Sequence, residues 1–286
     1  MARYSIITSA KDPAGINIRS NLIDLFKFEK TGEKFDDNDV FEYRRYKDKN
    51  IKLYLINDEL IFSENIDKKI ETDFLIFASK HRSASNAKSF AVHPIGNWSK
   101  ADFGGQEKKL CPSSAILLKR LFLSLNDFAK DSGFEITLEA THHGPYTEKP
   151  SVFVEIGSTE EEWKDRKNGE ILAGTVMKGI ETEIVDQKIA VGIGGSHYCN
   201  NFNKILLRTD IAVSHICPKY RLESIDAGSF RESILRTPEK FDFFLLDWKG
   251  LGKEKQKIME MFEGSPFEVK RADKVLGQKD LNISVY

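Results

Sequence analysis

The chain has few cysteines, almost no net charge and no long apolar run, and each shortage excludes a class of protein. Its three cysteines, Cys111, Cys199 and Cys217, are widely spaced and form no Cys-x-x-Cys pair, so they predict no disulfide framework and favour the cytosol. The 43 basic and 44 acidic side chains nearly cancel, which argues against broad coating of nucleic acid but leaves a local basic patch open. No run approaches the ~20 apolar residues that span a bilayer, and the N-terminus is too short and polar for a signal peptide. These absences predict a soluble cytoplasmic protein with no membrane partner.

Short apolar runs alternate with amphipathic stretches over most of the chain, as in an α/β protein. Strands are expected at residues 4–9, 41–46, 51–56, 74–78, 134–140, 151–156, 188–192, 211–216, 241–246 and 267–270. Helices are expected at 16–28, 168–178 and 251–262, after a cap at Ser113 or Ser114, and after a cap at Asp226. Residues 30–39 are polar and predict a loop, and residues 79–110 show little periodicity. The pattern predicts a mixed, largely parallel central sheet with helices on both faces, in one compact domain of residues 1–286. A small N-terminal lobe of residues 1–65 remains an alternative.

The run Thr141-His142-His143-Gly144-Pro145 follows one of the expected strands. Adjacent residues of a strand point to opposite faces, so both imidazoles reach one site only if the backbone bends, and Gly144 permits a bend. The alternative is one packed and one solvated histidine. Histidines also fall at other strand ends, where α/β sheets carry their sites: His81, His197 and His215, with His93 in the long irregular stretch.

A glycine-rich segment, residues 192–197, leads from a strand into His197. Its backbone N–H groups suit an anion or oxyanion, although a tight turn explains the same glycines. Glu155 lies near the end of its expected strand. It could be a metal ligand, a base for a bound water, or a solvent-facing side chain. The alternation of side chains along its strand predicts that Glu139 faces solvent. Asp247, at the end of another expected strand, could be a helix cap or loop anchor, or a functional residue.

Basic residues gather in two places. Residues 44–47, Arg-Arg-Tyr-Lys, suit contact with phosphates and bases, or form a solvated hairpin. Lys80 and Arg82 flank His81 at a strand end and are better placed to hold an anionic substrate. Trp98, close to His93, either stacks on a base or closes the core.

Five motifs in series resemble the archaeal and plant type of D-aminoacyl-tRNA deacylase, most closely between residues 74 and 220. They are His-Pro-Ile-Gly-Asn-Trp at 93–98, Phe-Gly-Gly at 103–105, Glu-Ala-Thr-His-His-Gly-Pro at 139–145, Pro-Ser-Val-Phe-Val-Glu-Ile-Gly-Ser at 150–158, and Gly-Gly-Ser-His-Tyr at 194–198. The resemblance implies a phosphorylase/hydrolase-like three-layer fold and hydrolysis of the ester between a D-amino acid and the 3′-terminal adenosine of tRNA. It further implies a broad range of D-amino acids, zinc as cofactor and a monomer.

The resemblance also suggests roles for the residues above. Metal ligands or a base would come from His142, His143, His197 and Glu155. Substrate would be held by Lys80, His81, Arg82, His93, Trp98, Gly194, Gly195 and Ser196, with the glycines stabilising the oxyanion and the cations meeting the terminal phosphates.

The part played by metal stays open at this point, because positioning and oxyanion stabilisation alone can hydrolyse an activated ester. Two other functions also stay open. One is a metal-dependent peptidase or amidohydrolase, which lacks a His-Glu-x-x-His signature here. The other is a non-catalytic protein that binds the tRNA 3′ end.

Overall fold

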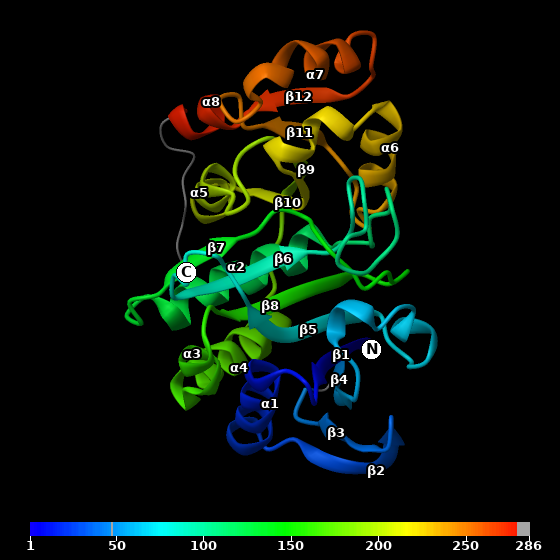
Figure 1. Cartoon of the computed structure of the whole chain (residues 1–286), viewed down its shortest axis with the longest axis vertical. Coiled ribbons are helices and arrows are strands. Elements are labelled where there is room, and N and C mark those ends of the chain that lie inside the picture. The colour runs from blue at the N-terminus through cyan, green and yellow to red at the C-terminus, as the bar shows by residue number, and fades with distance from the viewer. Residues whose placement is uncertain (47, 279–286) are drawn as a thin grey trace.

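A computed structural model describes residues 1–46 and 48–278 of the chain, and its strands form two sheets (Figure 1). The larger sheet has eight strands in the order β2-β3-β4-β1-β5-β8-β6-β7. Its strands are β1 (Ala2–Ser9), β2 (Glu29–Phe35), β3 (Asn38–Tyr43), β4 (Lys49–Ile56), β5 (Phe74–His81), β6 (Ser89–Pro94), β7 (Glu135–Leu138) and β8 (Ser151–Gly157). The central pairs β4-β1, β1-β5 and β5-β8 are parallel, whereas β2-β3, β3-β4 and β6-β8 are antiparallel.

The smaller sheet has four parallel strands in the order β10-β9-β11-β12. They are β9 (Lys188–Ile193), β10 (Ile211–Cys217), β11 (Phe243–Leu246) and β12 (Glu268–Arg271). Helix α2 (Ala115–Ala129) packs against β6 and β7 of the larger sheet and also against β10 of the smaller one. The apolar face of this one helix therefore joins the two sheets in a common core.

The two faces of the larger sheet are covered differently. One face packs against α1 (Pro13–Phe26), α2 and α4 (Arg166–Glu181), beside the short α3 (Glu160–Lys164). The opposite face carries Phe77 and Phe153, whose rings stack at 4.9 Å, and its cluster includes Leu60 and Ile66 from two 3₁₀ turns (Leu60–Phe62 and Ile66–Lys68). This second face lacks a covering α-helix among the described residues, which leaves room for a site.

Helices cover both faces of the smaller sheet. Helices α5 (Asn200–Arg208) and α8 (Ala272–Gly277) lie with α2 on one face. Helices α6 (Ala227–Leu235) and α7 (Lys255–Phe262) lie on the other. The expected three-layer α/β fold with a mixed, mostly parallel sheet is confirmed.

Several local predictions are confirmed and others are wrong. Ser114 and Asp226 are the N-caps of α2 and α6, as their positions predicted. The prediction of a loop at residues 30–39 is wrong, because β2 occupies most of this segment. Strand β2 is a polar edge strand, and among the described strands it pairs only with β3. Strand β6 was not expected, because it is buried on both faces and therefore lacks a solvent-facing polar side. Helices α5 and α8 were not expected either.

Candidate functional site

A cavity of about 420 Å³ opens on the face of the larger sheet that lacks an α-helical cover. Alternation along the strands brings its polar groups to this face: Ser79 and His81 follow Phe77 on β5, and Glu155 follows Phe153 on β8. His142 and His143 enter from the segment after β7, and His197 enters from the segment after β9 of the smaller sheet. His93, on β6, adds a fifth segment to these four. Five segments far apart in the sequence therefore meet in one wall of histidines and carboxylates beside the cavity.

The two adjacent histidines reach the same place because the backbone bends at His143. Strand β7 ends at Leu138, and His143 has a φ of 43°, in the left-handed region. The bend was expected at Gly144, but that glycine is needed for a different reason. A Cβ at Gly144 would lie 2.2 Å from the backbone N of Gly105 and 2.7 Å from the carbonyl O of Ile61, so the loop packs too closely there for any side chain.

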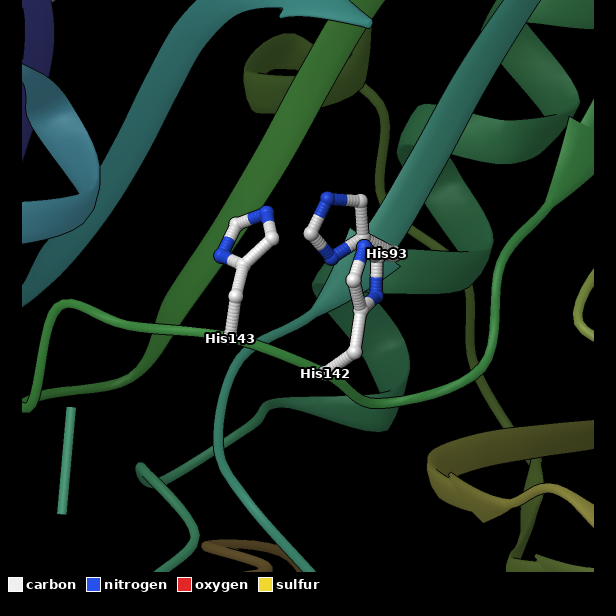
Figure 2. Close-up of side chains that lie close together, drawn as sticks. All are labelled: His93, His142 and His143. Atoms are coloured by element: carbon white, nitrogen blue, oxygen red, sulfur yellow. The ribbon is translucent and has the colours of Figure 1, made fainter. Parts of the chain in front are cut away.

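Three imidazoles lie together in this wall (Figure 2). The His93 ring centroid is 4.2 Å from that of His142 and 4.9 Å from that of His143, and the His142 and His143 centroids are 4.4 Å apart. Each Nδ1 atom faces a backbone carbonyl: Pro94 O at 3.1 Å, Ala140 O at 2.7 Å and Gly144 O at 2.6 Å, respectively. A carbonyl only accepts, so Nδ1 carries a proton in each ring. Nε2 is therefore left with a free lone pair in His142 and His143, whereas Nε2 of His93 faces Glu155, which outweighs burial and raises the pKa of His93.

Burial keeps two of these rings uncharged. It lowers the pKa of His143 to about 4, helped by the nearby His93. It also holds the pKa of His142 well below its usual value, where the charges of His93, His143 and His197 act in the same direction. Neutral imidazoles with fixed tautomers are the form that binds a metal ion or accepts a proton from water.

Two buried carboxylates face the imidazoles. Glu155 accepts a hydrogen bond from Ser79 Oγ at 2.6 Å, and its Oε2 lies 3.3 Å from Nδ1 of His81 and 3.7 Å from Nε2 of His93. Burial would raise the pKa of Glu155, but His81 and His93 outweigh it and hold that pKa well below the usual range. Glu155 is therefore an ionised carboxylate held by two histidines.

Glu139 is the site residue that sequence reasoning missed. A solvent-facing side chain was expected, and this is wrong, because Glu139 is fully buried. Its Oε1 lies 3.3 Å from Nδ1 of His81, and its Oε2 lies 3.6 Å from Nε2 of His142 and 3.4 Å from Nε2 of His197. Neither oxygen has a hydrogen-bond partner among the described residues. The available signal was its position just past an apolar strand and three residues before His142.

His81 balances the two carboxylates. Burial alone would lower its pKa, but the hydrogen bond with Glu155 and the charges of Glu139 and Glu155 raise the pKa of His81 to about 9. His81 is then an imidazolium at neutral pH. The wall thus combines two carboxylates, the imidazolium of His81, and the neutral rings of His142 and His143 with free Nε2 atoms.

Three sets of side chains in this wall can place their ligand atoms within 4.8 Å of one another. They are His93, His142 and His143; Glu139, His142 and His197; and His81, Glu139 and Glu155. Fully buried polar atoms without a hydrogen-bond partner also occur here, at Nε2 of His81 and His93 and at both oxygens of Glu139. The Nε2 atoms of the neutral His142 and His143 rings and the unpartnered oxygens of Glu139 are nitrogen and oxygen donors of the kind that fits zinc. His81, as an imidazolium, offers no lone pair.

Comparison with known proteins places this wall in a family. The family model described as D-aminoacyl-tRNA deacylase matches residues 68–270, which include every residue of the imidazole and carboxylate wall. The chain belongs to the D-aminoacyl-tRNA deacylase family. The family resemblance carried by the five motifs is thereby confirmed.

Relatives of the deacylase family match almost the whole chain. A D-aminoacyl-tRNA deacylase of Pyrococcus furiosus is 36% identical over 88% of this chain and 93% of its own length. One of Archaeoglobus fulgidus is 35% identical over 97% of this chain and 99% of its own. A crystal structure of a conserved protein of unknown function has 32% identity and a TM-score of 0.86, covering 97% of this chain and 98% of that one.

The predicted substrate residues of this deacylase-family chain fall in two groups. Lys80, His81 and Arg82 line the large cavity together with His142, His143, His197 and Glu155, whereas His93 and Glu139 do not line it. Neither Lys80 nor Arg82 forms an ion pair within residues 1–46 and 48–278. Trp98 is buried and donates from Nε1 to the carbonyl of Ile216. It lines a second cavity of about 150 Å³ instead of the large one.

The glycine segment lies away from both cavities. A Cβ on Gly195 would meet Asp247 Oδ2 at 2.9 Å, and one on Gly194 would meet Asp247 O at 3.0 Å, so these glycines allow a close turn against residues 247–250. Gly194, Gly195 and Ser196 do not line either cavity within the described residues. Asp247 closes this turn, because its Oδ1 accepts a hydrogen bond from the N–H of Gly250 at 3.1 Å.

Other candidates also lie outside the wall. His215 is fully buried beside Thr141 and Trp98 and lines neither cavity. In the basic cluster at 44–47, Arg44 pairs with Glu42, two residues earlier at the end of β3, and Lys47 lies outside the described residues. No helix of the described chain is both long and apolar enough to cross a membrane.

Proposed function

We propose that this chain hydrolyses the ester between a D-amino acid and the 3′-terminal ribose of tRNA, and that the wall of histidines and carboxylates is where the ester is cleaved. Family membership supports the reaction. The observation that supports the place is the convergence of five of the six histidines and two buried carboxylates in one wall. Four of these histidines and Glu155 line a cavity of ligand size. Water is added across the ester, which releases the D-amino acid and leaves a free ribose hydroxyl on the tRNA.

Residues of the wall would divide the chemistry between them. His142, His143, His197 and Glu155 are the proposed catalytic residues, and the contacts of Glu139 add it to this set. A neutral imidazole with a free Nε2 can take a proton from the attacking water. The carboxylates of Glu139 and Glu155 then stabilise the imidazolium that forms, and His81 lies within 3.3 Å of both.

Zinc fits this wall, and we propose it as the cofactor. His142, His143, His197 and Glu155 remain the proposed ligands, and His93 and Glu139 join them because their unpartnered atoms face the same space. When bound, zinc supplies Lewis acidity that polarises the ester carbonyl and favours deprotonation of water. The backbone carbonyls of Pro94, Ala140 and Gly144 hold the rings in the tautomer that such an ion needs.

Substrate binding would rely on the cavity rim. Lys80 and Arg82 lie over the ring of Trp163, 6.0 Å and 5.0 Å from its centroid, and would meet the terminal phosphates of tRNA. A broad range of D-amino acids remains part of the proposal, as the resemblance to the family implies. The protein would act in the cytosol as a monomer; its three buried, unpaired cysteines support a reducing compartment.

A paired time course tests the proposed function. The purified protein is incubated with D-tyrosyl-tRNA and, separately, with L-tyrosyl-tRNA, and the remaining ester is measured. We expect rapid loss of the D-ester and a rate close to that of spontaneous hydrolysis for the L-ester. Equal cleavage of both, or of neither, would refute the proposal.

A further inference from the structure

Two cavities meet at the same three side chains. His142, His143 and Phe103 line both the cavity of about 420 Å³ and the cavity of about 150 Å³. Phe103 is 67% exposed, so its ring stands between the two spaces with little else packed on it. A substrate that reacts at His142 and His143 can therefore extend into both cavities from one reacting bond.

We propose that the large cavity takes the terminal nucleotide of the tRNA and the small cavity takes the D-aminoacyl group, so that the scissile ester lies between them at His142 and His143. This inference rests on the proposed function and specifies how its substrate is oriented. Phe103 then separates the two halves of the substrate, and Asp102 and Tyr220 become recognition residues for the acyl half.

Size and charge support the assignment of the large cavity. The nucleotide is the larger half of the substrate, and only the large cavity has a volume in the range usual for ligand pockets of ~300 to ~1,000 Å³. Lys80 and Arg82 line that cavity, sit over the same tryptophan ring and have no acidic partner in the described ranges. Asp12, Glu59 and Glu155 line the same cavity, but neither cation forms an ion pair with them, so both cations can meet the phosphate group of a nucleotide.

The small cavity has the groups that an α-amino ester needs. Asp102 is its one carboxylate among the described residues, and no hydrogen bond or ion pair engages that carboxylate within them. Lys100 and Arg221 also line it, so the lining is mixed in charge. An aminoacyl group places an ammonium beside a carbonyl oxygen, which such a lining complements: Asp102 for the ammonium, a cation for the oxygen.

Tyr220 connects the small cavity to the catalytic wall. Its ring lines the small cavity, and its hydroxyl lies 3.1 Å from Nδ1 of His197, which lines the large one. Asn97 fixes the position of the loop between them, because its Nδ2 donates to Gly104 O at 2.9 Å. The acyl group would therefore rest between the 97–104 loop, which Asn97 closes, and Tyr220, which contacts His197.

The experiment compares matched substrates on matched variants. For the acyl half, Asp102→Asn and the control Glu107→Gln are assayed on D-tyrosyl-tRNA and on N-acetyl-D-tyrosyl-tRNA, which lacks the ammonium. For the nucleotide half, Arg82→Gln and the control Arg231→Gln are assayed on the D-tyrosyl esters of adenosine and of adenosine 5′-phosphate. Both control side chains are exposed and line neither cavity.

We expect Asp102→Asn to lower kcat/KM about fivefold to tenfold on D-tyrosyl-tRNA and to leave the N-acetyl substrate unchanged, the size expected of a partly exposed charge pair. We expect Arg82→Gln to lower kcat/KM by a similar factor only on the phosphorylated ester. Both control variants should match the wild type on all substrates.

A crossed result, with Arg82→Gln sensitive to the ammonium and Asp102→Asn sensitive to the phosphate, would reverse the assignment and overturn it. Equal losses on both members of a substrate pair would also overturn it, because a general loss shows no recognition of either half. If the wild type cleaves D-tyrosyl-tRNA, these outcomes leave the proposed function intact. If the wild-type protein cleaves none of the esters, both the proposed function and this inference are refuted.

Discussion

The Oε2 atom of Glu139 lies 3.4 Å from the Nε2 atom of His197, and the two residues come from different sheets. Glu139 follows β7 of the larger sheet, whereas His197 follows β9 of the smaller one. The backbones are joined at the same place, since the N–H of Ala140 donates to the carbonyl of His197 at 2.8 Å. The wall of histidines and carboxylates therefore depends on how the two sheets are docked, and α2 packs against both sheets.

Neutralising Glu139 tests its place in the wall. Glu139→Gln keeps the shape of the side chain but removes the charge that faces His81, His142 and His197, so we expect kcat/KM for D-tyrosyl-tRNA to fall at least tenfold. The matched control is Glu135→Gln, an exposed glutamate in the preceding strand. Wild-type activity in a folded Glu139→Gln protein would show that the carboxylate is structural only.

Metal removal tests the zinc proposal. After dialysis against a chelator, with metal loss verified by elemental analysis, we expect deacylation to be abolished and zinc to restore it. Binding of zinc to the stripped protein should also release protons and raise the melting temperature, both of which are measurable without substrate. Full activity in verified metal-free protein would remove zinc from the mechanism.

The buried His215 predicts a specific acid sensitivity. Burial lowers its pKa to about 4, against 6.5 for the free side chain, so the unfolded chain takes up a proton first as the pH falls. The folded state should therefore lose up to about 3 kcal/mol of stability from this group between pH 6.5 and pH 4. In denaturant unfolding, His215→Gln should lose less stability than the wild type over that range, and parallel curves would contradict the prediction.

The close packing at Gly144 predicts a coupled loss of stability and activity. Gly144→Ala would push a methyl group into Gly105 and Ile61 and displace the neighbouring His143, so we expect a lower melting temperature and at least a tenfold lower kcat/KM. Gly277→Ala, where the added Cβ meets no atom within 4 Å, is the matched control and should change neither quantity. An unperturbed Gly144→Ala protein would mean that the loop can move aside.

The sequence predicted the regular elements of the fold better than their edges. Helix caps such as Ser114 and Asp226 are local signals, and both are confirmed. Strand β2 has no apolar face, and β6 is buried on both faces although it carries His93, so periodicity could reveal neither. Pairing with β3 and with β7 and β8 stabilises them, and this is a tertiary effect.

The wall was partly predictable for a similar reason. The histidine pair stood out because it follows a strand and precedes a glycine, whereas Glu139 looked like an ordinary strand carboxylate. Glu139 is buried because the second sheet brings His197 against it. No local sequence pattern predicts this packing of one sheet against the other. The glycines at 194 and 195 were expected near substrate, but their turn packs on Asp247.

The central claim is that His142 and His143 belong to the group that cleaves the ester, and single-turnover deacylation of D-tyrosyl-tRNA tests it most directly. His142→Ala and His143→Ala are measured beside wild type and beside His215→Gln, a buried histidine outside both cavities. We predict a loss of at least tenfold in the cleavage rate for each of the first two, with little change in melting temperature, and a near-normal rate for His215→Gln. Normal cleavage by His142→Ala and His143→Ala, accompanied by a large drop in melting temperature, would contradict the account.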